Sequence, residues 1–263
     1  MRADVYLTVG GLSESRARAK RSIEEGRLSV NGKCVKKCSY EISEGDAVEL
    51  RGEDMPFVSR GGLKLLGAIK TFGIDVNGLD AVDIGASTGG FTDCLLQHGA
   101  SKVYAVDCGK DQLHQKLRND PRVISIEGFN ARELTAGTLG QQCDIAVMDV
   151  SFISQTLLYG AVKSTVKDGG SFVSLIKPQF EAGRGAIGRG GIVKDKKIHV
   201  SVISDVLDKA RACGLFASGL AVSPIEGGDG NTEYLALFRV GYDTDVPIDA
   251  EFIKRTVEKV PKE

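Results

Sequence analysis

The chain of 263 residues has no long hydrophobic run, only 6 prolines and no excess of charge of one sign. No stretch approaches the roughly 18 consecutive apolar residues of a membrane-spanning helix, and the first residues lack the apolar core of a signal peptide. We therefore expect a cytoplasmic protein without a membrane span. The 34 basic and 35 acidic residues give a net charge of −1, which argues against a uniformly basic nucleic-acid coat.

Potential metal ligands are few and scattered. The chain has 6 cysteines and 3 histidines, and only Cys34 and Cys38 are close in sequence. This pair has no second pair and no nearby histidine, so it is a poor zinc site. We expect no metal centre and reduced, structurally incidental thiols.

Glycine, in contrast, is abundant, at 33 residues. With so few prolines and no repeat, these glycines do not indicate collagen and should serve particular loops. One group lies at 85–90 and a second at 183–191, which includes Arg184 and Arg189. The second group predicts a mobile cationic lid over RNA or cofactor, with an ordinary connection as the alternative.

The first 40 residues differ in charge from those that follow. They hold nine bases and four acids, a net of +5, whereas residues 41–60 hold six acids and two bases. Ser13 and Gly26 are suitable caps for a basic helix between them. Asn31-Gly32 between two short apolar runs predicts a β-hairpin, and 47–50 a further strand. Met55-Pro56 marks the expected end of this module.

From Leu79 onward, short apolar runs alternate with helical segments, which predicts a parallel sheet covered on both faces. The final two strands have no helix between them and indicate an antiparallel finish. The expected strands are 81–84, 103–106, 123–126, 145–148, 172–176, 216–222 and 234–240, and the expected helices lie near 90–98, 111–119, 154–166 and 195–213.

The run Asp83-Ile84-Gly85-Ala86-Ser87-Thr88-Gly89-Gly90-Phe91 is a strand end, a glycine-rich turn and a helix start. A nucleotide-like ligand binds at such a place in an α/β sheet. Because Ser87 replaces the second glycine of a dinucleotide motif, the loop suits a nucleoside better than a diphosphate. Asp107 ends the next strand, 22 residues after Gly85, where a carboxylate can accept hydrogen bonds from a ribose. The alternative is a tight turn with a solvated acid.

This arrangement resembles the class I S-adenosylmethionine-dependent methyltransferases. The resemblance implies a Rossmann-like, seven-stranded, mostly parallel sheet with an antiparallel last strand. It also implies S-adenosylmethionine as cofactor, held by Asp83, Gly85, Ala86, Ser87, Thr88, Gly89, Gly90, Phe91, Asp107, Asn130 and Asp149.

Four charged residues lie at strand ends or at the entry to this domain: Lys64, Asp149, Lys177 and Glu233. Strand ends on one edge of a parallel sheet converge on the ligand crevice. The motif Asp149-Val150-Ser151-Phe152 lacks the two prolines typical of methyltransferases that act on exocyclic amines. The order Lys-Asp-Lys-Glu resembles the FtsJ-like RNA ribose 2′-O-methyltransferases and implies these four as catalytic residues. If Lys177 is neutral it could take the proton of the 2′-hydroxyl, and if charged it would stabilise the developing alkoxide.

Together with the N-terminal module, these segments look like the TlyA family, often labelled haemolysin A, whose members are similar to ribosomal RNA 2′-O-methyltransferases. The module resembles the S4 RNA-binding domain. We expect an α+β S4-like domain at 1–54, a junction at 55–60, a methyltransferase domain at 61–243 and a C-terminal tail or helix at 244–263. The expected RNA contacts are Arg2, Arg16, Arg18, Lys20, Arg21, Arg27, Asn31, Lys33, Arg60, Arg184 and Arg189.

The expected partner is ribosomal RNA, within ribosomal subunits. Two alternatives remain open at this point: a non-catalytic RNA-binding assembly factor, and a haemolysin that acts on membranes. The intact glycine loop disfavours the first, and the missing apolar spans disfavour the second.

Overall fold

The computed structural model describes residues 1–24, 26–52, 55–183, 185, 188, 191–228, 230–243 and 248–260. The chain forms two compact units, Met1–Pro56 and Phe57–Glu263. Each unit has its own hydrophobic core, and each is described by itself below.

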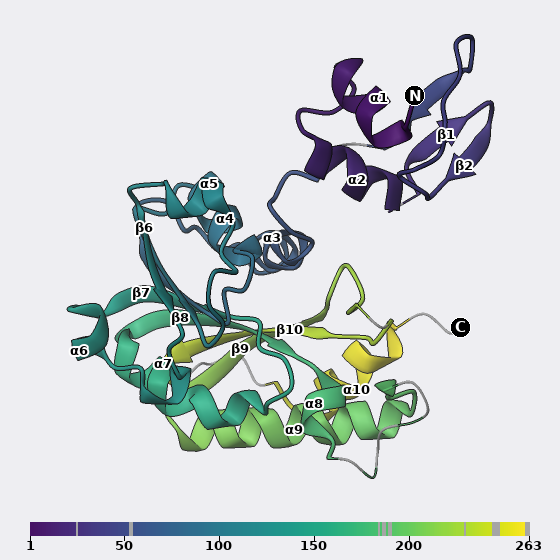
Figure 1. Ribbon diagram of the computed structural model, residues 1–263. Coiled ribbons are helices and arrows are strands. Elements are labelled where there is room, and N and C mark those ends of the chain that lie inside the picture. Colours follow the sequence, from purple (N-terminus) through teal and green to yellow (C-terminus); the bar gives the residue numbers. More distant parts are fainter. Residues whose placement is uncertain are drawn as a thin grey trace. The chain divides into compact units, whose positions relative to one another are not determined.

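The first unit packs two helices on a small sheet (Figure 1). The helices are α1 (Ala3–Val9) and α2 (Arg16–Glu24), and the strands β1 (Leu28–Val30), β2 (Lys33–Val35) and β3 (Val48–Leu50) pair antiparallel in the order β2-β1-β3. The predicted hairpin is present: Asn31 and Gly32 adopt φ of 51° and 78°, which a tight turn between β1 and β2 requires. Leu7, Ile23 and Leu28 are fully buried in its core. Helix α1 was not expected.

The second unit is a seven-stranded sheet in the order β6-β5-β4-β7-β8-β10-β9. Strands β4 (Asp80–Ile84), β5 (Lys102–Asp107), β6 (Val123–Glu127), β7 (Cys143–Met148) and β8 (Val166–Ile176) form parallel pairs. Strand β10 (Tyr234–Val240) runs antiparallel between β8 and β9 (Leu215–Val222). The predicted fold class is therefore confirmed.

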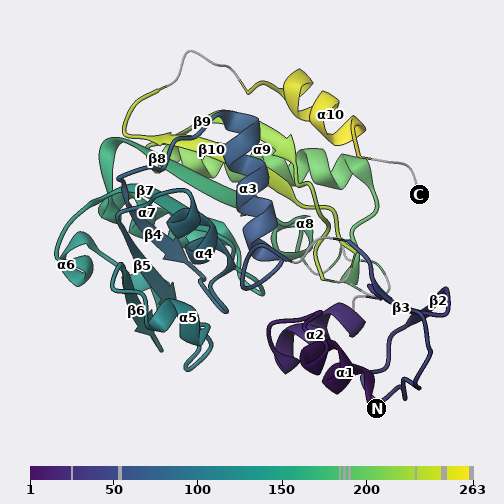
Figure 2. The ribbon, with the colours of Figure 1, turned by 90° about the horizontal axis from the view of Figure 1, so that it is seen from above.

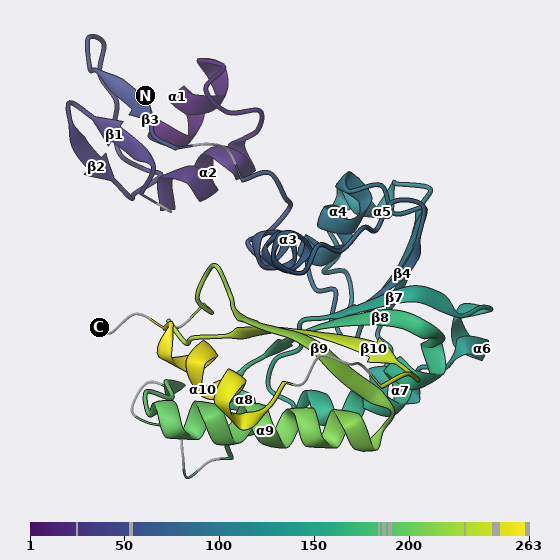
Figure 3. The same cartoon turned by 180° about the vertical axis from the view of Figure 1, so that it is seen from behind.

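Helices cover both faces of this sheet (Figures 1 and 3). On one face lie α3 (Gly61–Phe72), α4 (Gly90–Gln97) and α5 (Gln115–Arg118), and α3 packs on β10 (Figure 2). On the other face lie α7 (Tyr159–Thr165), α9 (Lys196–Ala212) and α10 (Ala250–Glu258). Alternation along β4 explains the two layers, because Val82 joins the core on the α7–α9 side and Ala81 the core on the α3–α4 side.

Short elements complete the connections: η1 (Ala131–Glu133), α6 (Ala136–Leu139), η2 (Gln155–Leu158) and α8 (Pro178–Glu181). The turn α8 directly follows β8, and η2 follows the loop after β7. Both short elements therefore lie at the carboxyl edge of the sheet, where the charged residues singled out in the sequence also lie.

Three predicted boundaries were wrong. The helix expected at 111–119 is reduced to α5, because Asp111 has a left-handed φ of 57° and the Gln112 and Leu113 amides bind Glu127 instead. The helix expected at 154–166 is divided into η2 and α7.

The strand expected at 172–176 begins earlier, at Val166, as part of β8. Its early part, which is largely exposed, contains Lys167 and Asp168, and the pairing with β7 shifts register there. Because this part of β8 has no run of apolar residues, its sequence shows no sign of a strand.

Candidate active site

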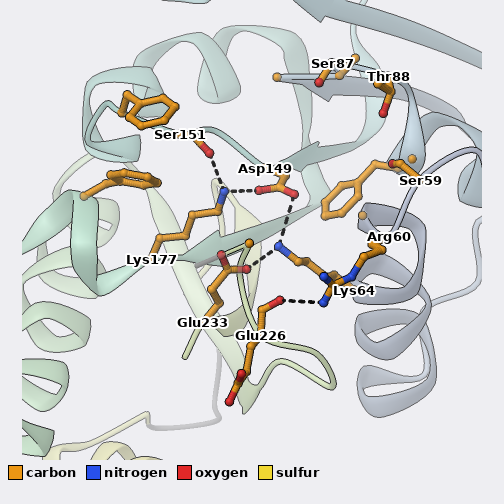
Figure 4. A pocket seen from close by; sticks show the side chains of 18 of the residues that line it. Ser59, Arg60, Lys64, Ser87, Thr88, Asp149, Ser151, Lys177, Glu226 and Glu233 are labelled. Carbon is orange, nitrogen blue, oxygen red and sulfur yellow. Dashed lines mark hydrogen bonds and ion pairs between the residues drawn. The ribbon is translucent and has the colours of Figure 1, made fainter. Parts of the chain in front are cut away.

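A pocket of about 400 Å³ opens at the carboxyl edge of the sheet in the second unit. This is the position where open α/β sheets bind their ligands, and the volume is within the usual range for small-molecule sites. Its wall comes from the loop after β4, the loop after β7, the start of α3, the turn α8 and the segment before β10 (Figure 4).

The glycine loop after β4 forms one wall. Gly85, Ser87 and Gly89 have positive φ of 85°, 48° and 93°, so the backbone turns sharply between β4 and α4. A Cβ atom on Gly85 would lie 2.9 Å from the carbonyl oxygen of Asp149. Glycine therefore allows this loop to run directly beside the end of β7.

The first turn of α4 also approaches the start of α3 closely. A Cβ atom on Gly90 would lie 2.3 Å from Ser59 Oγ and 2.9 Å from the Gly62 nitrogen. The side chain of Asp93 accepts a hydrogen bond from the Val58 amide at 2.8 Å, which fixes the segment that leads into α3. This packing brings Ser59 and Arg60 to the pocket.

The four predicted charged residues are brought together in this pocket (Figure 4). Lys177 Nζ lies 2.6 Å from Asp149 Oδ1 and donates to Ser151 Oγ at 2.9 Å. Lys64 Nζ lies 2.6 Å from Glu233 Oε2 and 3.9 Å from Asp149 Oδ2. Asp149 thus lies between the two lysines.

These groups are largely shielded from water. Side-chain exposure is 10% for Lys64, 8% for Lys177 and 2% for Glu233. Burying a charge is costly unless an opposite charge accompanies it. Asp149 is 19% exposed, and the two lysines and two carboxylates have a net charge of zero, which explains how they can lie together with so little contact with water.

Asp83 lies beneath the glycine loop rather than in the pocket wall. It is fully buried, and its Oδ2 accepts from the Thr92 amide at 2.9 Å and from Thr92 Oγ1 at 2.7 Å. Its Oδ1 has no partner within the described residues. Loss of hydration, aided by the nearby charges of Asp149 and Asp107, raises the pKa of this carboxyl group to about 7.

The other predicted cofactor residues are placed differently. Asp107 accepts from the Ser87 amide at 2.8 Å and the Gly109 amide at 2.7 Å, so its carboxylate holds the glycine loop. Asn130 caps η1 through the Arg132 amide and is exposed. The pocket wall includes Gly85, Ala86, Ser87, Thr88, Gly90 and Phe91, but not Gly89, Asp107 or Asn130.

Comparison with known proteins identifies the family. Residues 57–240 match the FtsJ-like methyltransferase model, and residues 1–48 match the S4 domain. The chain belongs to the FtsJ-like methyltransferase family. Hemolysin A of Brachyspira hyodysenteriae is 44% identical over 90% of this chain and 99% of its own length.

A second relative extends the match over the whole chain. The 16S/23S rRNA (cytidine-2′-O)-methyltransferase TlyA of Mycobacterium tuberculosis is 37% identical over 100% of this chain and 97% of its own length. A solved structure of a candidate hemolysin from Streptococcus thermophilus has 44% identity and a TM-score of 0.78, and covers 98% of this chain and 94% of that one. The predicted TlyA-type resemblance is confirmed.

The S4 domain carries most of the predicted RNA-binding residues, and several of them already have acidic partners. Arg2 and Arg16 both bind Asp4, at 3.0 and 2.8 Å. Their hydrogen bonds lower the pKa of Asp4 to about 2, so this acid is ionised at any working pH. Arg18 pairs with Glu14, and Lys20 with Glu24.

Two further candidates in the S4 domain make structural contacts. Arg27 donates to the carbonyl oxygens of Arg51 and Gly52, both at 2.9 Å. The Asn31 side chain donates to Asp46 at 2.8 Å and accepts from the Ala47 amide at 2.9 Å. Lys33 is exposed on β2, and Arg21 is exposed on α2. An RNA-binding role for each of these residues stays a prediction.

In the FtsJ-like domain, the Arg60 guanidinium donates to the Glu226 carbonyl oxygen at 3.4 Å at the edge of the pocket. Arg184 and Arg189 lie outside the described residues, as does most of the predicted lid. In the segment before Glu233, the Gly227 amide donates to the Asn231 carbonyl oxygen at 2.9 Å.

Sequence reasoning missed two aromatic residues at the pocket. Phe152 is 92% exposed with a left-handed φ of 65°, and its ring centroid lies 5.2 Å from that of Phe180. Both residues line the pocket, and Lys177 Nζ lies 5.7 Å from the Phe180 ring centroid. Such rings can stack on an unpaired base. The available signal in the sequence was an aromatic residue three positions after the strand-end Asp149.

In the described part of the chain, no helix combines the length and apolar character needed to cross a bilayer.

Proposed function

We propose that this protein transfers a methyl group from S-adenosylmethionine to the ribose 2′-oxygen of a cytidine in ribosomal RNA. The observation that carries the proposal is the meeting of the Lys64–Asp149–Lys177–Glu233 group with the glycine loop in one pocket of an FtsJ-like domain. The cytidine and the ribosomal RNA come from the relative that is 37% identical over the whole chain. We infer action in the cytoplasm and on ribosomal subunits for the same reason.

The pocket fits the cofactor in size and in the character of its wall. The loop Gly85–Thr88 presents backbone and small side chains, which leave room for a nucleoside. Asp83 has one buried carboxylate oxygen with no partner among the described residues, and Asp107 and Asp149 add negative charge around a cationic ligand. We propose that this loop and these acids hold S-adenosylmethionine, which supplies an electrophilic methyl group on a sulfonium.

Lys177 is the residue we assign to the 2′-oxygen. As an ammonium it has three N–H donors; Ser151 accepts from it and Asp149 forms its ion pair. A remaining N–H can bind the 2′-oxygen and stabilise the charge that develops as the hydroxyl proton leaves to water. Asp149 orients Lys177, and Glu233 balances the charge of Lys64, which lies on the other side of Asp149.

The S4 domain is proposed to dock structured RNA through phosphate contacts, and the boundaries 1–54, 55–60, 61–243 and 244–263 remain our proposed domain division. Because methylation is carried by one domain and docking by the other, RNA affinity and methyl transfer should be separable by mutation. We expect the isolated RNA chain to be a poorer substrate than a ribosomal subunit that presents it in folded form.

The test is incubation of the full chain with methyl-labelled S-adenosylmethionine and purified ribosomal subunits, followed by mapping of 2′-O-methyl groups by mass spectrometry. Label on a cytidine ribose of either subunit supports the proposal. Label on a base would contradict it. Failure to bind S-adenosylmethionine in calorimetry would favour the non-catalytic RNA-binding alternative, and leakage of liposomes caused by the pure protein would favour the membrane alternative.

A further inference from the structure

The loop that follows β7 carries three residues of the candidate site, Asp149, Ser151 and Phe152, and little within the loop itself fixes its shape. Ser151 and Phe152 are exposed, and Phe152 has a backbone conformation that non-glycine residues rarely adopt. Such a conformation persists only when the surrounding structure enforces it. The Phe152 ring contacts that of Phe180 in α8, and further contacts to α8 lie at the end of the loop, where η2 begins.

Glu181, the last residue of α8, binds the start of η2 through both carboxylate oxygens. Oε1 accepts from the Gln155 amide at 2.9 Å, and Oε2 accepts from Ser154 Oγ at 2.6 Å. Since α8 begins directly after Lys177, these bonds connect the loop that carries Ser151 to the segment that carries Lys177. The Gln155 amide lies at the start of the 3-10 helix η2, where a backbone N–H has no partner inside the helix. The Ser154 hydroxyl belongs to the residue that caps the same helix.

Gln155 forms a second connection between the same two segments. Its side chain is 1% exposed; Nε2 donates to the Leu175 carbonyl oxygen at 3.2 Å, and Oε1 accepts from Ser174 Oγ. Ser174 and Leu175 are among the last residues of strand β8, just before Lys177. A buried polar network with its partners satisfied holds its groups in one arrangement.

We infer that Glu181 is a positioning residue for methyl transfer: it holds the loop after β7 against α8 so that Ser151 and Asp149 keep Lys177 aimed into the pocket. This inference rests on the proposed function. Glu181 does not line the pocket, so its effect would pass through Lys177. A displacement of about 1 Å at reacting groups can lower a rate by as much as about a hundredfold.

The kinetic test compares Glu181→Ala and Glu181→Gln. Alanine removes both bonds, whereas the glutamine amide can accept from the Gln155 amide and donate to Ser154 Oγ. We expect Glu181→Ala to lower kcat about tenfold or more with the KM for S-adenosylmethionine changed less than about threefold, and Glu181→Gln to restore most of kcat. Asp144→Ala is the matched control, because Asp144 also accepts from a backbone amide, that of Asp80, at 3.0 Å, but at the opposite edge of the sheet.

A double mutant tests whether Glu181 acts through Ser151. If it does, Glu181→Ala combined with Ser151→Ala should be little worse than the more damaging single variant, because both remove the same support of Lys177. Independent, multiplying effects would overturn the inference. So would a loss of kcat in Glu181→Ala no larger than that in Asp144→Ala at equal stability.

Chemical labelling gives a readout that needs no RNA. The Lys177 side chain is 8% exposed, so its reaction with a lysine-reactive ester, followed by mass spectrometry, should be slow in the wild-type chain. We expect faster labelling of Lys177 in Glu181→Ala and not in Glu181→Gln or Asp144→Ala. Unchanged labelling would overturn the positioning role of Glu181, whatever the substrate of the enzyme is. A failure of this inference can therefore be told apart from a failure of the proposed function.

Discussion

Lys177 and Asp149 meet across two neighbouring parallel strands, with Nζ 2.6 Å from Oδ1. Asp149 follows β7 and Lys177 follows β8, so the pairing of these two strands sets the distance between the two charges. Ser151 Oγ is a further partner of the ammonium, at 2.9 Å. The Lys177 ammonium is thereby fixed at the carboxyl edge of the sheet, the same edge at which the glycine loop leaves β4.

Replacing Lys177 should abolish methyl transfer without unfolding the site. In Lys177→Ala we expect a loss of kcat of about a hundredfold or more, the size usual for a group that moves a proton or stabilises charge in a transition state. Binding of S-adenosylmethionine in calorimetry should change little. Lys209→Ala is the control, because Lys209 forms an exposed pair with Asp205 on α9. Retained activity in Lys177→Ala would remove this residue from the mechanism.

The location of this charged pair could be predicted from the sequence, because a residue that follows an apolar strand run must lie at the carboxyl edge of a parallel sheet. The contact of Lys177 with Ser151 and that of Phe152 with Phe180 could not be predicted. Ser151 and Phe152 lie in a loop whose path depends on the distant Glu181 and on a left-handed residue, and neither leaves a periodic pattern. Helix α1 was missed for a related reason: it spans only Ala3–Val9 and is held by tertiary packing rather than by its own length.

Asp107 shows the same limit at the level of a side chain. Its position at the end of β5 was predicted correctly, but its bonds to the Ser87 and Gly109 amides depend on loop geometry that the sequence does not specify. A strand-end acid can bind a ligand, hold a loop or do both. Position along a strand therefore predicts which residues gather at a site more reliably than it predicts what each one contacts.

A side chain added at the glycine loop should impair cofactor binding. In Gly90→Ala the new Cβ would meet Ser59 Oγ at 2.3 Å and the Gly62 nitrogen at 2.9 Å, so α3 or α4 must shift. Overpacking of this kind costs about 1–3 kcal/mol of stability, and we expect S-adenosylmethionine affinity to fall about tenfold. Gly160→Ala is the control: it lies in α7 with nothing within 4 Å of the added atom and should not lower affinity. Equal affinities in calorimetry would contradict this account.

Asp83 should make the stability of the second unit depend on pH. Burial raises its pKa from 3.8 to about 7, so the folded state holds a proton that the unfolded chain releases near pH 4. Its contribution to stability is therefore greatest below about pH 4, falls by up to roughly 1.4 kcal/mol per pH unit until about pH 7, and is level above that.

The variant Asp83→Asn cannot ionise and should lack this slope. Urea unfolding between pH 5 and 8, followed by hydrogen exchange of the β4 peptide, measures the second unit alone. The stability difference between the wild-type chain and Asp83→Asn should shift in favour of the variant as the pH rises. A difference that is constant over this range would show that Asp83 is already ionised at pH 5 in the folded chain.

RNA binding by the S4 domain should depend on salt through residues that have exposed charges. Each phosphate contact contributes about −0.9 to the slope of log K against log salt for duplexes and about −0.7 for single strands. Lys33 on β2 and Arg21 on α2 are exposed, whereas Arg16 shares Asp4 with Arg2. We expect Lys33→Ala and Arg21→Ala each to weaken binding and to reduce the slope by about one unit.

Arg16→Ala should reduce the slope less, because its partner Asp4 remains ionised and the change removes a positive charge that was already balanced. Lys254→Ala, an exposed position on α10 of the second unit, is the control and should leave the slope unchanged. Filter binding of ribosomal RNA from about 50 to 300 mM salt gives the slope for all four variants under the same conditions. If Arg16→Ala lowered the slope most, the Asp4 pair would have to open when RNA binds, and Arg16 would be the principal phosphate contact of this domain.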